Sequence, residues 1–168
     1  MNGILLIKDK LDNLYNRITT GNEDLLNELD SILVDILKYD DLSMYDVDEA
    51  EQIISMINSF TEKINSMYEL LDVQRNNMYT LEYLREEFKK IEIKKFNIEN
   101  SYVMGIITVD DLNEFKEMLF QFRNTLYAIP INDDNLLEIA KMKSKIQHFN
   151  TYVLEDEEIL KQAYKNSN

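Results

Sequence analysis

Residues 40–51, DDLSMYDVDEAE, carry six carboxylates in twelve positions. Such a group can bind a divalent cation, imitate the phosphates of a nucleic acid, or begin a helix. A calcium loop of the EF-hand type needs oxygen ligands at alternate positions and a glycine at its sharp turn. Asp46 and Asp48 match the first two ligand positions, but Ala50 occupies the third and Glu51 stands where the glycine is required. We therefore expect no bound metal.

His148 is the only histidine of the chain. A helical di-iron site requires two Glu-x-x-His units, and here Lys145 occupies the position of the glutamate. A histidine that does acid-base chemistry also needs a positioned partner, whereas Lys141, Lys143 and Lys145 make the local field positive. We interpret His148 as a packing or surface residue.

Other catalytic patterns are also missing from the sequence. Phosphate-binding loops need several close glycines, but the three glycines of this chain are widely spaced. The acidic pairs Glu86-Glu87 and Glu157-Glu158 are typical of solvated helix faces, because glycosidase carboxylates act from a shared cleft. The sequence predicts a non-enzymatic protein without a cofactor.

The spacing of Asp46 and Glu49 favours a helix start for the acidic stretch. In a capping box, an N-cap oxygen accepts from an otherwise free amide, and a carboxylate three residues later reaches back. Asp48, Glu49 and Glu51 then fall in or next to the first turn, where the helix dipole favours negative charge.

The elements around this stretch are predicted to be helices, because no glycine or proline lies between Asn22 and Met104. Apolar residues at 3-4 spacing predict helices over residues 4–18, 25–39 and 47–71. The members of these stripes are Ile4, Ile7, Leu11, Leu14 and Ile18; Leu25, Leu29, Ile32, Ile36 and Tyr39, with a neighbouring row at Leu26, Leu33 and Leu37; and Val47, Ala50, Ile53, Ile54, Ile57, Phe60, Ile64, Met67 and Leu71.

Residues 47–98 form either one long helix or two, and we favour a break near Asn76-Asn77, where the pattern weakens. A helix of about fifty residues would extend about 75 Å, which exceeds the width of a compact domain. Around residues 91–108 the pattern also allows a small β-hairpin, because Ile91 and Ile93 alternate with polar residues and a β-branched run follows.

The second half predicts further helices. Thr108 and Asp111 repeat the capping pattern before a stripe of Leu112, Phe115, Leu119, Phe122, Leu126 and Ile129, and Pro130 ends that helix. Asn132 or Asp133 can cap the next helix, and a final short helix is expected around Asp156 to Tyr164. The predicted fold is mainly α: a compact bundle of about five to seven helices in a single acidic domain, 1–168.

The formal net charge of -14 is concentrated in the first half of the chain. Residues 1–72 carry 5 basic and 16 acidic side chains, whereas residues 73–100 carry 6 and 5. This charge opposes direct binding to nucleic acid or to anionic membranes and favours a protein partner with a basic surface. A short basic patch (Arg85, Lys89, Lys90, Lys94 and Lys95) is expected to neutralise the acidic half, within the fold or across a dimer; contact with nucleic acid is the weaker alternative.

The chain has no cysteine, and its N-terminus has only four consecutive apolar residues before Lys8. An apolar run of that length is too short for a signal-peptide core or a membrane span. These features predict a cytoplasmic protein.

On the third predicted helix, the face opposite the core carries acidic side chains and serines. Carboxylates three or four residues apart lie about 5–6 Å from each other, which is comparable with the phosphate spacing of a nucleic-acid strand. We therefore predict a protein-binding module, such as a viral or mobile-element inhibitor of the DNA-mimic or anti-defence type. The predicted partner-binding residues are Asp40, Asp41, Asp46, Asp48, Glu49, Glu51, Glu62 and Glu69.

Two other interpretations of the sequence stay open. The acidic face can serve solubility alone, since charged faces keep proteins soluble without any specific partner. Alternatively, the apolar stripes and the ten tyrosines serve a helical homo-oligomer or assembly scaffold, because tyrosine is favoured at interfaces.

Overall fold

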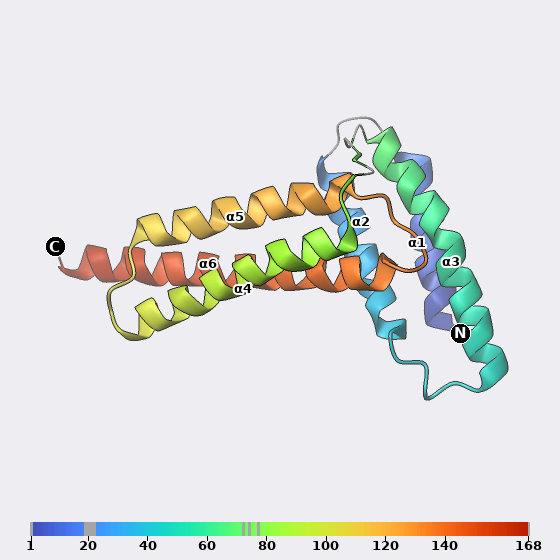
Figure 1. The fold of residues 1–168 in the computed structure, drawn as a ribbon, viewed down its shortest axis with the longest axis horizontal. Helices are drawn as coiled ribbons and strands as arrows, with labels where there is room; N and C mark the ends of the chain where they lie inside the picture. Colours follow the sequence, from blue (N-terminus) through green and yellow to red (C-terminus); the bar gives the residue numbers. More distant parts are fainter. Residues whose placement is uncertain (1, 19–22, 72, 74, 77, 168) are drawn as a thin grey trace. The chain divides into compact units, whose positions relative to one another are not determined.

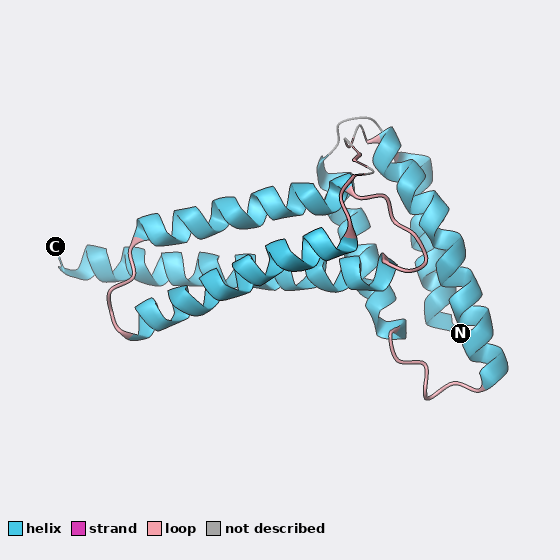
Figure 2. Ribbon diagram, viewed as in Figure 1, coloured by secondary structure: helices cyan, strands magenta, loops and turns pink. Residues whose placement is uncertain are grey.

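The computed structural model describes residues 2–18, 23–71, 73, 75–76 and 78–167. These residues form helices and connecting loops and no strand, as Figure 2 shows, which confirms the mainly α prediction. No helix in this described part is both long enough and apolar enough to cross a membrane. The chain divides into two compact units, Met1–Met78 with Tyr127–Lys143 and Tyr79–Leu126 with Ser144–Asn168.

The first unit contains three helices and a short 3-10 helix (Figure 1). Helix α1 spans Asn2–Arg17, α2 spans Glu23–Ile36, η1 spans Leu37–Tyr39 and α3 spans Val47–Leu70. Each of α1, α2 and α3 contacts the other two. The unit is completed by the end of α5 (Val109–Ala128), the loop that contains Pro130, and the beginning of α6 (Leu136–Ser167).

The core of the first unit consists of the predicted apolar stripes. Fully buried members are Ile4, Leu11, Leu14, Leu29, Leu33, Ile36, Ile53, Ile64 and Met67, all with 0% exposure. Val47 and Ile54 are exceptions, because they lie on the outer side of the first turns of α3 and are 74% and 47% exposed. Gly21, the predicted end of the first helix, lies outside the described residues.

Asn65 and Arg75 fix the loop after α5 to α3. The Asn65 amide donates to the carbonyl of Ile131 at 2.6 Å, and the Ile131 amide donates back to Asn65 Oδ1 at 2.8 Å. The Arg75 guanidinium donates to Asn65 Oδ1 at 2.7 Å and to the carbonyl of Ile129 at 2.9 Å. Burial lowers the pKa of Arg75. These bonds satisfy backbone groups that an irregular segment leaves without helical partners.

The second unit is built from α4 (Leu81–Val103), most of α5 (Val109–Ala128) and the later part of α6 (Leu136–Ser167). These three helices lie side by side in Figure 1. Phe88 of α4 lies 5.6 Å from Phe122 of α5 and 6.2 Å from Phe149 of α6, measured between ring centroids. Aromatic residues from all three helices therefore meet in the core of this unit.

The long apolar pattern of residues 47–98 belongs to two helices, α3 and α4, as favoured from the sequence. Helix α3 ends at Leu70, and α4 begins at Leu81 behind Thr80, whose side chain accepts from the amide of Tyr83 at 3.1 Å. The break therefore lies between residues 70 and 81, and Asn77 itself lies outside the described residues.

The alternative of a β-hairpin around residues 91–108 is wrong, because residues 91–103 are helical. Ile91 and Ile98 are seven residues apart and point into the core, with 3% and 5% exposure. Ile93 and Phe96 point outward, and each is 61% exposed. Two apolar faces of one helix therefore produced an alternation that resembles the two-residue period of a strand.

Gly105 ends α4 with a φ of 72°, a conformation that favours glycine. The amide of Ile106 donates to the carbonyl of Ser101 at 3.0 Å, and the amide of Gly105 donates to the carbonyl of Tyr102 at 3.1 Å. These are the two hydrogen bonds of a Schellman motif. We expect Gly105→Ala to lower the free energy of unfolding by about 1 kcal/mol, because a Cβ strains this conformation. Urea denaturation measures the loss, and an unchanged midpoint would contradict it.

Helix α5 begins with the predicted capping box. The amide of Asp111 donates to Thr108 Oγ1 at 3.2 Å, and the amide of Thr108 donates to Asp111 Oδ2 at 3.1 Å. Before α6, Asn132 Oδ1 accepts from the amides of Asp134 and Asn135, each at 2.9 Å. Of the two predicted caps for this helix, Asn132 is therefore the one that accepts these bonds.

The prediction of a separate short helix around Asp156 to Tyr164 is wrong, because α6 runs without a break from Leu136 to Ser167. No glycine or proline interrupts this stretch. Val153 is only 2% exposed and continues the buried stripe from Phe149. Ile159, which lies within the predicted short helix, is 50% exposed.

The carboxylate of Glu157 on α6 accepts from the ammonium of Lys116 on α5. It also lies 2.9 Å from the ammonium of Lys161, one helical turn further along α6. Hydrogen bonds from Lys116 and then Lys161 lower the pKa of Glu157 to about 2. Because the pKa of Glu157 is lower in the folded state, its ionised carboxylate stabilises the fold at pH values above the unfolded-state pKa of about 4.5. This contribution is lost as the pH falls through the folded-state pKa of about 2. We expect Glu157→Gln to be less stable than wild type near neutral pH and equally stable below pH about 2, in urea denaturation across this pH range.

Candidate partner-binding surface on α3

The eight predicted partner-binding carboxylates lie on the loop between η1 and α3 and on α3 itself. Seven of them are exposed, and Glu49 is half-buried. Asp40 and Asp41 precede the helix, Asp46 is its N-cap, and the others follow along its length. The stretch DDLSMYDVDEAE is therefore a loop followed by a helix start, and Asp46 Oδ1 accepts from the amide of Glu49 at 2.8 Å.

Three of the eight carboxylates have a structural role inside the first unit. Asp40 forms an ion pair with Lys141 at 2.8 Å. Asp41 Oδ1 accepts from the amide of Ser43 at 2.9 Å, and this hydrogen bond lowers the pKa of Asp41. Asp46 is engaged as the helix cap. These side chains are exposed, but their charges already serve local contacts.

The four remaining exposed carboxylates share one side of α3 with three serines. We call this side the α3 acidic face, which comprises Asp48, Glu51, Ser55, Ser59, Glu62, Ser66 and Glu69. The face follows 3-4 spacing over about 31 Å of helix. Within the described part of the chain, no ion pair involves Asp48, Glu51 or Glu62. Glu69 has an electrostatic interaction with Arg75. Between Glu51 and Glu62 the face carries serines, so its negative charge lies in two groups about 16 Å apart.

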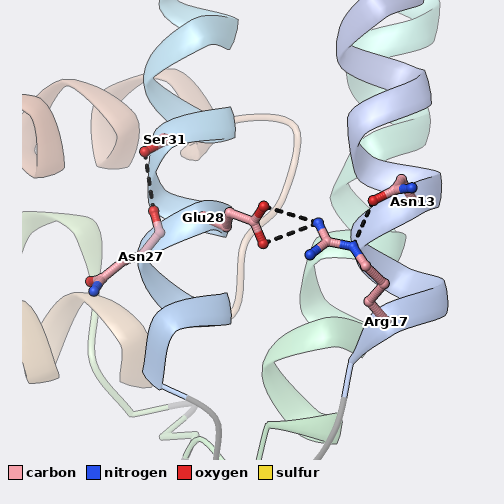
Figure 3. Close-up of polar contacts among 5 residues, drawn as sticks. All are labelled: Asn13, Arg17, Asn27, Glu28 and Ser31. Carbon is pink, nitrogen blue, oxygen red and sulfur yellow. Dashed lines mark hydrogen bonds and ion pairs between the residues drawn. The ribbon is translucent and has the colours of Figure 1, made fainter.

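Carboxylates on α1 and α2 differ from those of the α3 acidic face, because cations of the same unit lie against them. Arg17 of α1 donates to both oxygens of Glu28 of α2, at 2.9 and 3.1 Å, and its Nε donates to Asn13 at 2.6 Å (Figure 3). Lys10 bonds Asp35 at 3.2 Å. The fold itself thus neutralises much of the charge on these two helices.

A half-open groove of about 510 Å³ lies between α1 and α2. Its lining includes Lys10, Arg17, Glu28 and Asp35, the residues that form the ion pairs across it. Because both signs of charge are already matched there, the groove lacks the single-sign potential that attracts a charged ligand.

A buried polar cluster in the first unit was not found from the sequence. Lys143 of α6 is 4% exposed, and its ammonium donates to Asp30 Oδ1 at 2.8 Å and to the hydroxyl of Tyr68 at 2.6 Å. Tyr127 donates to the other oxygen of Asp30. The ammonium also lies 4.1 Å from the centroid of the Tyr127 ring. We call these four residues the Lys143 cluster.

The sequence did contain a signal for this cluster. Asp30 falls within the apolar row Leu26, Leu33 and Leu37, four residues after the first and three before the second. Lys143 likewise falls between Ala140 and Ile146 in the stripe of α6. A charged residue inside an apolar stripe must find a partner when it is buried, so each position indicates a buried polar contact, and the structure identifies the partner.

The basic patch and His148 lie in the second unit. Lys90, Lys94 and Lys95 pair with Glu87, Glu114 and Glu99, at 2.9, 3.3 and 3.0 Å. These three lysines thus pair with carboxylates of their own unit and not with the acidic first half of the same chain. Neutralisation across a dimer stays a prediction. His148 is exposed on α6, and the edge of its ring contacts Tyr152 at 5.5 Å between centroids.

Among the described residues, no three histidine, cysteine, aspartate or glutamate side chains lie close enough together to hold a metal ion. Comparisons with protein-family models, with curated proteins and with solved structures find no match for this chain. The function must therefore be inferred from the residues and their geometry alone.

Proposed function

We propose that the protein is a non-enzymatic binding module whose α3 acidic face occupies a basic site on a nucleic-acid-handling protein. A DNA-mimic inhibitor of viral or mobile-element origin, acting in the cytoplasm against a host defence, is the form of this function that we favour. The observation that carries the proposal is the set of exposed carboxylates Asp48, Glu51 and Glu62 on one side of α3, with which no described cation forms an ion pair.

The distribution of charge between the two units supports this choice of surface. The first unit carries 8 basic and 19 acidic side chains, a net charge of -11, and the second carries 10 and 13, a net charge of -3. A concentrated negative field accelerates encounter with a positive surface and repels nucleic acid. A basic groove built for a phosphate backbone is complementary to such a field.

A charge-neutral variant of the α3 acidic face tests the proposal. Glu51→Gln, Glu62→Gln and Glu69→Gln together remove three charges with little change in shape. A basic partner is first captured on the immobilised wild-type chain and then purified. We expect the Kd of the triple variant for this partner to be at least about tenfold higher than that of the wild type. Raising the salt from about 50 to about 500 mM should weaken wild-type binding sharply, because exposed charges are screened. Isothermal titration calorimetry measures both effects.

A matched control carries Asp110→Asn, Glu117→Gln and Glu158→Gln, which remove three exposed charges from the second unit. We expect this control to bind as the wild type does, because the α3 acidic face is intact. Duplex DNA should displace the wild-type chain from the partner, since both compete for one groove. Equal losses in the two triple variants, or no displacement by DNA, would count against the proposal.

A further inference from the structure

The outward side of α4 carries large apolar side chains that nothing in the second unit covers. Ile93 and Phe96 are each 61% exposed, Val103 is 83% exposed and Met104 is 70% exposed. The opposite side of the same helix holds Leu84, Phe88, Ile91 and Ile98, which are at most 5% exposed. Helix α4 is therefore apolar on two sides, and only one of them packs within its unit.

The outward side has the residue spacing of a coiled-coil seam. Ile93, Phe96, Asn100 and Val103 follow a 3-4-3 pattern, which places them on one line along the helix. Lys89 extends this line toward the N-terminus of α4. A single asparagine in such a seam specifies register and orientation at some cost in stability.

The apolar area approaches the apolar share of a standard interface, in which somewhat over half of the buried area is apolar. The five side chains of Ile93, Phe96, Val103, Met104 and the nearby Ile106 are between 61% and 83% exposed. At roughly 100 Å² for a fully exposed aliphatic side chain and roughly 200 Å² for a fully exposed aromatic one, they present on the order of 400 Å². Monomers rarely expose apolar patches larger than a few hundred Å², and a standard interface buries about 800 Å² per partner.

Antiparallel pairing makes the centre of this face complementary to itself, although Val103 at its end then lies opposite Glu86. With Ile93 of one copy opposite Phe96 of the other, Lys89 lies opposite Asn100, whose amide oxygen can accept from the ammonium. A parallel arrangement would instead oppose Lys89 with Lys89. The two-fold symmetry of a homodimer generates the antiparallel contact when its axis is perpendicular to α4. The face also lies in the second unit, whose net charge of -3 opposes self-association less than the -11 of the first.

We propose that the outward side of α4, centred on Ile93 and Phe96, binds the same face of a second copy of this chain in antiparallel orientation. This inference does not rest on the function proposed for α3. The dimer would present two α3 acidic faces, and so would bind a partner with two basic sites more tightly than a monomer.

Sedimentation of the full chain tests the dimer. We expect the wild type to form a dimer within a concentration series that extends to about 100 µM. Ile93→Glu or Phe96→Glu should each raise the dimer Kd at least about tenfold. Met44→Glu is the matched control, because Met44 is 83% exposed in the first unit and the added charge is the same. Circular dichroism confirms that each variant is folded. A monomer at all these concentrations, or equal effects of the three substitutions, overturns the proposal.

Introduced thiols test the orientation, because the chain has no cysteine of its own. In the antiparallel register, residue 86 of one copy faces residue 103 of the other, whereas two residues 103 lie about 25 Å apart. Under oxidised glutathione, a mixture of Glu86→Cys and Val103→Cys should form the mixed disulfide dimer. Val103→Cys alone should stay largely uncrosslinked, since disulfides require Cα atoms within about 7 Å. Efficient crosslinking of Val103→Cys alone overturns the antiparallel arrangement.

The outcome for α3 is separable from the outcome for α4. The triple variant of the α3 acidic face should dimerise as the wild type does, because its substitutions lie in the other unit. Loss of partner binding with an intact dimer would support the function proposed for α3, and a monomeric protein that still binds its partner would overturn only the inference about α4.

Discussion

Replacing Lys143 with methionine is expected to lower the free energy of unfolding by about 3–5 kcal/mol, because the substitution leaves a buried carboxylate without its cation. Asp30 is 4% exposed, and the Lys143 ammonium is 2.8 Å from its Oδ1. Water cannot replace the lost ammonium at such a depth without opening the core. Urea denaturation of the full chain measures the loss.

Lys141→Met is the matched control for this prediction. Lys141 is two residues away on the same helix and also forms an ion pair at 2.8 Å, with Asp40, but its side chain is 51% exposed. Exposed ion pairs contribute at most about 1 kcal/mol, so this control should remain close to wild type. If the two methionine variants lose the same stability, the ammonium of Lys143 is not held as a buried charge.

The double variant Lys143→Met with Asp30→Leu separates the charge effect from packing. Removing both charges leaves no unpaired ion in the core, although the hydroxyls of Tyr68 and Tyr127 lose partners at about 1–3 kcal/mol each. We expect the double variant to be more stable than Lys143→Met alone. A double variant that is less stable than either single variant would show that packing, and not the ion pair, governs this site.

The second large effect is expected from Phe115→Ala, which should lower the free energy of unfolding by about 3–5 kcal/mol through the cavity it creates. Phe115 is 1% exposed, and its ring centroid lies 6.4 Å from that of Phe149 on α6. Phenylalanine at this position therefore joins two helices of the second unit. Thermal and urea unfolding of the full chain report the change.

Phe120→Ala provides the comparison on the same helix. Phe120 is 53% exposed, so the same truncation should change stability by no more than about 0.5 kcal/mol. Similar losses for the two variants would contradict the assignment of the core and outer faces of α5. The pair also controls for the change in helix propensity, because both substitutions replace phenylalanine with alanine in a helix interior.

The apolar stripes show how far the sequence alone predicts this fold. The stripe from Leu112 to Ile129 is buried as expected, and the capping box at Thr108 forms in both directions. At Asp46 the N-cap bond from the amide of Glu49 forms, without the return bond from the Glu49 carboxylate. Side-chain periodicity and capping depend on residues within one or two turns, so one sequence is sufficient to read them. The exposed position of the carboxylates on α3 follows from the same periodicity.

The errors arose where one segment has two apolar sides or no punctuating residue. Ile93 and Phe96 lie on the outer side of α4, and their alternation with Ile91 and Ile98 imitated a strand. At the end of the chain, Val153 carries the buried stripe through a polar stretch that looked like a break. Local patterns cannot distinguish an inner from an outer apolar residue, because that difference is set by which helices are neighbours.

The sequence by itself determined that this chain is helical, strongly acidic and able to place carboxylates along one side of its third helix. Only the tertiary structure decided which charges are neutralised, since Asp30 meets Lys143 across 113 positions and Glu28 meets Arg17 across the α1–α2 contact. Helix periodicity acts over a few residues, whereas the pairing of buried charges depends on how distant helices pack. That packing leaves Asp48, Glu51 and Glu62 of α3 to face solvent.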